Sequence, residues 1–213
     1  MNDNQIIALL YEHSIEIFQK CDDRHFGQYF LIRDKFSNRN FDKEFEGTFC
    51  NFYILNGPGG LTTKQKEVFF ELLSSGEGDL DRIIQSLYNI PGYRERHCFY
   101  LSFGTKLLHT LENRLPIYDH NIATVLDLPS QTNTGSFEDK LNNRKRIYLE
   151  LIQRFDGLLA KPEMADCLQS ARISLRKLFE VKSLLWRDEL VSDTKLLDSL
   201  LWALYSVTRK NHS

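Results

Sequence analysis

The chain lacks closely spaced cysteines, long apolar runs and an excess of basic residues, and each absence excludes a class of protein. Its four cysteines are dispersed, at Cys21, Cys50, Cys98 and Cys167. This spacing contains no C-x-x-C pair and no grouping of thiolates for a zinc or iron–sulfur site. We therefore expect four reduced, largely buried thiols in a reducing compartment.

Every apolar run is shorter than the roughly 20 residues that a membrane helix needs. The first residues, Met1 to Asn4, are polar and lack the cationic start of a signal peptide. We expect a cytoplasmic protein without membrane attachment. The formal net charge is -2, whereas dedicated non-specific nucleic-acid binders are clearly basic. Contact with nucleic acid would therefore need a local basic patch.

What the chain does contain is the pattern of an all-α protein. Its 213 residues, 42% of them hydrophobic and 26% charged, can bury a sizeable core. We expect a single all-helical unit over 1–213 that forms two lobes, one over about 42–130 and the other from 1–41 plus 131–213. Apolar residues recur at helical spacing almost throughout. This periodicity predicts helices over Gln5–Lys20, Phe41–Leu55, Thr62–Leu73, Arg96–Asn113, Asp119–Leu126 and Ser136–Leu159, with others starting near Asp79, Pro162 and Ser192.

Local signals mark several helix starts and one interruption. Thr62 with Gln65 has the spacing of a capping box, and Asp79 is suited to cap the next helix. Between Asp22 and Asn40, aromatic residues are interleaved with charges, and we expect a loop or an irregular helix there.

The segment Ile90–Pro129 holds the residues with chemical content. On a helical wheel, Lys106 and His109 are neighbours three positions apart, on the side away from the apolar stripe. Asp119 follows at the expected start of the next helix. We expect a cation, an imidazole and a carboxylate to converge on one edge between two helices.

Two proline turns frame this segment. Ile90-Pro91-Gly92 ends one helix, and Leu115-Pro116-Ile117-Tyr118-Asp119 leads to an aspartate that opens another. This order resembles the catalytic core of the helix-hairpin-helix base-excision DNA glycosylase superfamily, and Asp119 matches the family's aspartate. A second resemblance is to divergent bacterial relatives of this fold, which carry Lys-Leu-Leu-His, Pro-Ile-x-Asp and Lys-x-Leu-Asp-x-x-Leu-Trp. These motifs read here as Lys106–His109, Pro116–Asp119 and Lys195–Trp202.

The resemblance implies a two-lobed helical fold that binds double-stranded DNA and excises a damaged or modified base. Asp119 would be the catalytic carboxylate, with Lys106 and His109 as further catalytic candidates. The candidates for substrate binding are Tyr118, His120 and Asn121, because an extruded base needs an aromatic or apolar pocket. The candidates for DNA contact are Gly92 and Arg94 of the hairpin and the basic run Arg144, Lys145 and Arg146.

The chain departs from the family at two points. Arg94 stands where a second hairpin glycine is typical, and glycine there exposes the backbone N–H groups that bind phosphate. The lysine nucleophile of bifunctional members opens the helix after the hairpin, farther from the aspartate than Lys106 is. This spacing favours a monofunctional, water-based reaction. His97, His109 and His120 lack a metal-ligand spacing, and we expect neither metal nor cofactor.

Every candidate also has a purely structural interpretation. Asp119 could be a helix N-cap, Lys106 an exposed helix lysine, and His109 a histidine that satisfies a hydrogen bond. Tyr118 and His120 could pack at a helix start, and the basic run could be a solvated helix face. Two functions therefore stay open: a DNA N-glycosylase, which is a hydrolase, and a non-catalytic module that keeps the fold and binds nucleic acid or a protein.

Overall fold

The computed structural model describes residues 1–57 and 59–209. This part of the chain contains eleven α-helices, two short 3-10 helices and no strand, so the all-α prediction is confirmed. The helices are α1 Asp3–Glu12, α2 Ser14–Lys20, α3 Asp23–Ser37, α4 Lys43–Phe52, α5 Thr63–Ser75, α6 Leu80–Tyr88, α7 Leu101–Leu111, α8 His120–Val125, α9 Phe137–Leu159, α10 Pro162–Val181 and α11 Asp193–Thr208.

Short polar side chains define most helix starts, because the first N–H groups of a helix have no partner within it. Thr62 and Gln65 form the predicted capping box at α5. The predicted cap Asp79 accepts from the backbone N–H groups of Asp81 and Arg82 at the start of α6. The prolyl ring of Pro162 opens α10, where its missing N–H costs nothing.

Two predicted segments differ from the structure at the N-terminal end. Most of the segment 22–40, where we expected a loop or an irregular helix, forms the regular helix α3 Asp23–Ser37, capped by Asp22. Phe26, Tyr29 and Phe30 share its buried side, while the interleaved charges occupy the remaining positions of the helical wheel. The predicted helix Gln5–Lys20 is interrupted at His13, which ends α1 and precedes α2.

The predicted helix Arg96–Asn113 is also shorter than expected. Only Leu101–Leu111 is helical, and Arg96, where we expected the helix to begin, is extended and belongs to the hairpin. There the Gly92 N–H donates to the Arg96 carbonyl at 2.8 Å, which closes a turn instead of a helix.

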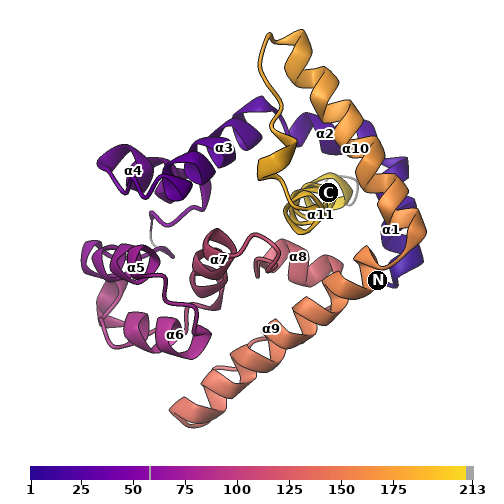
Figure 1. The fold of residues 1–213 in the computed structure, drawn as a ribbon. Helices are drawn as coiled ribbons and strands as arrows, with labels where there is room; N and C mark the ends of the chain where they lie inside the picture. The colour runs from indigo at the N-terminus through magenta and orange to yellow at the C-terminus, as the bar shows by residue number, and fades with distance from the viewer. Residues whose placement is uncertain (58, 210–213) are drawn as a thin grey trace.

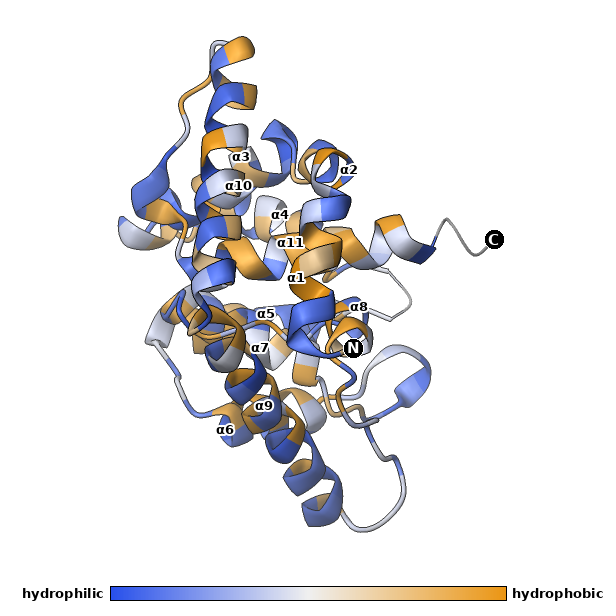
Figure 2. Cartoon of the chain, turned by 90° about the vertical axis from the view of Figure 1, so that its right-hand side faces the viewer, coloured by the Kyte–Doolittle hydropathy of each residue, from blue (hydrophilic) through white to orange (hydrophobic). Residues whose placement is uncertain are grey.

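The leucine-rich helix α11 lies near the centre of the molecule (Figure 1). It packs against α8, α2 and α1, and α9 and α10 also contact it. Figure 2 shows α11 mostly in hydrophobic colours, whereas the long helix α9 alternates between polar and apolar residues. Because α11 is buried on nearly all sides, polar groups on it must find partners inside the protein.

Several packing contacts join the segments that we assigned to different lobes. The pairs α8 with α11, α6 with α9, and α3 with α4 all cross the predicted division. Buried apolar residues from α1 to α11 form one hydrophobic cluster. Among the described residues, no helix has both the length and the apolar character that crossing a bilayer requires.

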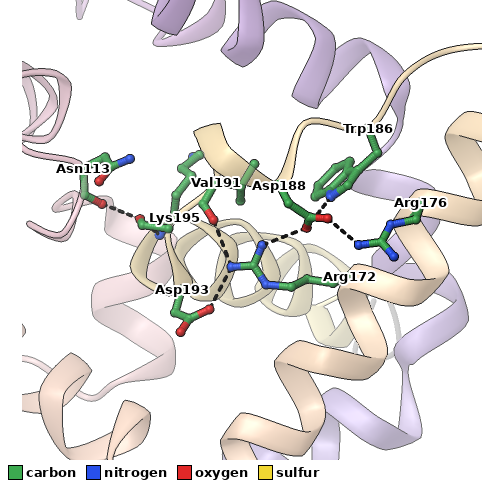
Figure 3. A network of polar contacts seen from close by, with 9 residues as sticks. Asn113, Arg172, Arg176, Trp186, Asp188, Val191, Asp193 and Lys195 are labelled. Carbon is green, nitrogen blue, oxygen red and sulfur yellow. Dashed lines mark hydrogen bonds and ion pairs between the residues drawn. The ribbon is translucent and has the colours of Figure 1, made fainter.

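A network of ion pairs fixes the start of α11 (Figure 3). The guanidinium of Arg172, on α10, donates to Asp188 at 3.2 Å, to the Val191 carbonyl at 2.9 Å and to Asp193 at 2.8 Å. The Trp186 indole N–H donates to the same Asp188 carboxylate at 2.7 Å. These contacts hold the connection from α10 to α11, and so they position the polar residues in the first turns of α11.

Candidate active site

A pocket of about 580 Å³ lies where α2, α3, α4, α7, α8 and α11 approach one another. Side chains far apart in the sequence line it, because the fold brings the ends of several helices together. Its buried charged residues are Lys106, Lys195 and Asp198, and its half-buried ones are Lys20, Asp22 and Asp119. Its rings are those of His25, Phe52, Tyr53 and Trp202.

Lys106 reaches the pocket from α7 and is only 9% exposed. Its Nζ donates a hydrogen bond to the Tyr53 carbonyl at 2.9 Å and lies 5.0 Å from the centre of the Phe103 ring. Burial lowers the pKa of Lys106 to about 8, although the carboxylates of Asp119 and Asp198 act in the opposite direction. The interpretation of Lys106 as an exposed helix lysine is therefore wrong. A lysine with this pKa is partly neutral near neutral pH, and only the neutral amine is a nucleophile.

Asp119 is both a helix cap and a wall residue of the pocket. It caps α8, and its Oδ1 accepts from the Asn121 N–H at 2.7 Å. It is half-buried and lines the pocket together with Lys106. Capping thus accounts for one oxygen of Asp119, Oδ1, and Asp119 also lines the pocket while it caps α8.

A second pair of charges, which sequence reasoning missed as a site, comes from α11. Lys195 Nζ donates to Asp198 Oδ2 at 2.7 Å, and the two side chains are only 3% and 8% exposed. The ammonium group also lies 5.2 Å from the centre of the Tyr29 ring and 5.4 Å from that of Phe52. Asp198 Oδ1 is buried and has no hydrogen-bond partner in the part of the chain that the structure describes.

The signal for this pair was present in the sequence. Lys195 and Asp198 stand three positions apart in a helix whose other residues are largely leucine. Charges within such an apolar helix are costly unless they are paired or functional. The motif Lys195–Trp202 had suggested a family resemblance, but we had assigned no role to its charges.

Aromatic rings cover another side of the pocket. The His25 ring stacks on Trp202 at 5.9 Å with 21° between the planes, and its Nε2 lies 3.1 Å from Ser199 Oγ. Burial lowers the pKa of His25 to about 3, so this imidazole is neutral. Its centre is 5.1 Å from that of Phe52. The pocket therefore offers flat π surfaces beside its charged side chains.

The rim of the pocket carries cations and one exposed apolar side chain. Lys20 and Arg24 contribute positive charge, and Arg24 also contacts Asp22 at 3.5 Å. Ile54 is 71% exposed, and its backbone has a left-handed φ of 54°. A β-branched residue rarely adopts this conformation, so the turn that presents Ile54 and the Tyr53 carbonyl is strained.

His109, which we predicted beside Lys106 and Asp119, lies elsewhere. It is fully buried and does not belong to the described pocket lining. Its Nε2 is 3.3 Å from the Tyr29 hydroxyl, and its Nδ1 is 2.7 Å from the Leu115 carbonyl. Burial lowers the pKa of His109 to about 3. The described contacts of His109 are those of a neutral histidine that joins α3 to the turn after α7.

The three predicted substrate-binding residues also lie outside the pocket lining that the structure describes. Tyr118 is buried, and its backbone N–H donates to Thr105 Oγ1 at 2.9 Å. His120 is exposed, with its ring centre 6.5 Å from that of Tyr205. Asn121 contacts Asp119 through its backbone.

The hairpin has the backbone geometry of a glycine-rich turn without its second glycine. Gly92 is buried, and a Cβ there would lie 2.7 Å from the Tyr100 hydroxyl oxygen. Arg94 is exposed with a left-handed φ of 59°, followed by Glu95 at 55°. Arg94 thus adopts a conformation that favours glycine.

The basic run on α9 divides into three different environments. Arg144 is 3% exposed, donates to Asn133 Oδ1 at 2.8 Å and lies 5.2 Å from the centre of the Phe99 ring. Lys145 is half-buried and pairs with Asp81 at 2.7 Å. Arg146 is exposed. A single solvated face therefore does not describe the run, since Arg144 points into the protein.

Metal ligands do not gather at the pocket or elsewhere in residues 1–57 and 59–209, where no group of three or more His, Cys, Asp or Glu side chains is placed to hold an ion. Among the four cysteines, Cys21, Cys50 and Cys167 are buried and Cys98 is half-buried.

In comparisons with known proteins, no family model, no curated protein and no solved structure matches this chain.

Proposed function

We propose that this protein is a DNA N-glycosylase-like enzyme of two-lobed helix-hairpin-helix architecture, which removes a damaged or modified base from duplex DNA. One observation carries the proposal: the Lys106 amine and the Asp119 carboxylate line the same pocket, beside the rings of Phe52 and Trp202. An extruded base needs flat surfaces on which to stack, and its sugar needs a carboxylate and a nucleophile near C1′.

The residues of the pocket have complementary roles in this reaction. Asp119 carries negative charge that would stabilise the cationic sugar as the N-glycosidic bond breaks. The pKa of about 8 leaves roughly a quarter of Lys106 neutral at pH 7.5. In the amine route, Lys106 Nζ bonds to C1′ and loses a proton, while the base departs with the bonding electrons and takes up a proton. Opening of the sugar ring then leaves a Schiff base on Lys106.

The burial of Lys106 favours this amine route over the water-based route that its sequence spacing suggested. Borohydride distinguishes the two routes, because it reduces a Schiff base to a stable covalent link between protein and DNA. The water-based route forms no Schiff base and therefore gives no such cross-link. We expect wild-type protein to form such a cross-link on the duplex from which it excises a base. Activity without a cross-link would assign the attack to water.

The decisive substitution is Asp119→Asn. Asparagine caps helices as well as aspartate does, so the fold should change little while the charge is lost. Using duplexes with alkylated, oxidised or deaminated bases, we expect abasic product from the wild type and a loss of at least 100-fold in Asp119→Asn. Asp79→Asn makes the same change at the N-cap of α6, at an exposed residue outside the described lining of the pocket, and as the matched control it should retain activity.

The alternative is a non-catalytic module that binds nucleic acid or a protein. It is favoured by the net charge of -2 and by the internal partners of Arg144 and Lys145, which reduce the basic surface. Binding to every duplex without product from any of them would support this alternative. A gel-shift series at rising salt tests phosphate contact, because such contacts make affinity fall with salt concentration. A flat response would argue against DNA as the partner.

A further inference from the structure

Two residues that line the pocket carry a buried oxygen without a hydrogen-bond partner among the described residues, Asp198 Oδ1 and the Tyr53 hydroxyl, and of the two only the carboxylate oxygen is purely an acceptor. Asp198 is 6% exposed and lines the pocket. Its Oδ2 accepts a hydrogen bond from Lys195, whereas its Oδ1 meets no donor within residues 1–57 and 59–209. A buried carboxylate oxygen that accepts no hydrogen bond lowers the stability of the folded protein. The loss is larger than for a buried neutral acceptor without a donor, because the carboxylate is charged. Such a group calls for a donor from outside the chain, which a bound water or a ligand can supply.

The surroundings of Asp198 specify the chemistry of that donor. Lys195 already neutralises the carboxylate at 2.7 Å, so a second cation is not needed to balance it. Phe52, Trp202 and His25 provide flat walls in the same pocket. A planar, neutral heterocycle with an N–H group fits both the walls and the free oxygen.

We propose that Asp198 is a specificity-determining residue, whose Oδ1 accepts a hydrogen bond from the ring N–H of a lactam base. In a lactam base, such as hypoxanthine or uracil, a ring N–H lies next to a carbonyl. This proposal rests on the proposed function only in taking the ligand to be a nucleobase. Beyond the proposed function, it specifies which edge of the base is recognised, the ring N–H next to a carbonyl, and which residue recognises it, Asp198.

Lys195 has a positioning role in this arrangement. Its ammonium group donates to Asp198 Oδ2 and also lies within 5.4 Å of the centres of the Tyr29 and Phe52 rings, which restrict its position. Asp198 therefore presents Oδ1 in one orientation. A base whose ring nitrogen is methylated has no donor there and places a methyl group against a buried carboxylate oxygen.

The test uses free heterocycles, so that it is independent of base excision. The probes are 9-methylhypoxanthine and 1,9-dimethylhypoxanthine, with 1-methyluracil and 1,3-dimethyluracil as the pyrimidine pair. Each pair differs in the ring N–H alone, and the glycosidic nitrogen is methylated in all four. Titration calorimetry should show wild-type protein binding one or both N–H forms at least tenfold more tightly than their methylated partners. Equal binding within each pair, or no binding of any probe at 10 mM, would overturn the proposal.

The variant must remove Asp198 without leaving Lys195 unpaired. In the double variant Lys195→Met/Asp198→Leu, apolar groups of similar size replace the whole pair, which buried ion pairs often tolerate. Circular dichroism checks its fold. We expect the N–H preference to vanish in this variant and to persist in Asp119→Asn, which changes another acidic residue of the same pocket. A preference that survives in the double variant, or is lost in Asp119→Asn, would reject Asp198 as the reader.

The two proposals fail in different ways. Absence of base excision on every duplex, together with an N–H preference that depends on Asp198, would reject the glycosylase and leave a base-binding pocket. Base excision with no N–H preference would retain the enzyme and reject the role of Asp198.

Discussion

Replacing Lys106 by methionine should stabilise the protein at neutral pH, and the gain should disappear at high pH. Burial lowers the pKa of Lys106 from 10.5 to about 8. At pH 7 the folded protein therefore holds a charged amine in a site that disfavours it, at a cost of about 3 kcal/mol. Methionine fills a similar volume without charge, but it leaves the Tyr53 carbonyl without its donor at 2.9 Å, which costs about 1–3 kcal/mol. We expect a net gain of about 0–2 kcal/mol at pH 7.

The pH dependence of this difference is the sharper measurement. A lysine whose folded pKa is depressed binds protons less tightly when folded, so its contribution to stability rises between pH 8 and 10.5. Wild-type protein should thus gain about 3 kcal/mol relative to Lys106→Met across this window. The other titratable groups are the same in both proteins, so their contributions cancel in the difference between the two free energies of unfolding.

Urea unfolding at several pH values from 7 to 11 gives the free energies of unfolding for both proteins. Lys64→Met, at an exposed position on α5, controls for the loss of a lysine in general. A difference between wild type and Lys106→Met that stays constant from pH 7 to 11 would refute the lowered pKa. It would also remove the basis for Lys106 as a neutral amine.

Two further predictions concern the hairpin and the ion-pair network. Gly92→Ala should destabilise the protein by about 1–3 kcal/mol, because its Cβ would lie 2.7 Å from the Tyr100 hydroxyl oxygen. In α4, a Cβ added at Gly47 would meet no described atom within 4 Å beyond its chain neighbours and the backbone of its own helix, so Gly47→Ala should instead stabilise the protein by about 0.5–1 kcal/mol. Thermal unfolding of both variants tests whether the two changes in stability have opposite signs. Arg172→Met should lower stability by about 1–3 kcal/mol, since the carboxylate of Asp188 and the Val191 carbonyl each lose a donor. A loss below 0.5 kcal/mol in urea unfolding would show that the network of Figure 3 does not hold the start of α11.

Local sequence patterns were enough to predict most of the helices and several of their N-caps, because these features depend on residues close together in the chain. Helical periodicity, prolines and short polar caps predicted an all-α chain and the caps Thr62, Asp79 and Asp119, because capping joins groups two or three residues apart. The break at His13 and the regular helix α3 escaped prediction. In α3, packing of Phe26 and Tyr29 against other helices outweighs the weak local signal.

Only the tertiary structure decided which polar residues meet. Lys106 and Asp119 share a pocket with Lys195 and Asp198, although 76 or more residues separate the two pairs in the chain. His109, three positions from Lys106, is turned into the core instead. Burial and electrostatic coupling depend on distances through space, and a sequence orders residues only along the chain. The sequence by itself therefore determined the helices and the identity of the charged groups, and the packing of α11 against α8 and α2 decided which of those groups form one site.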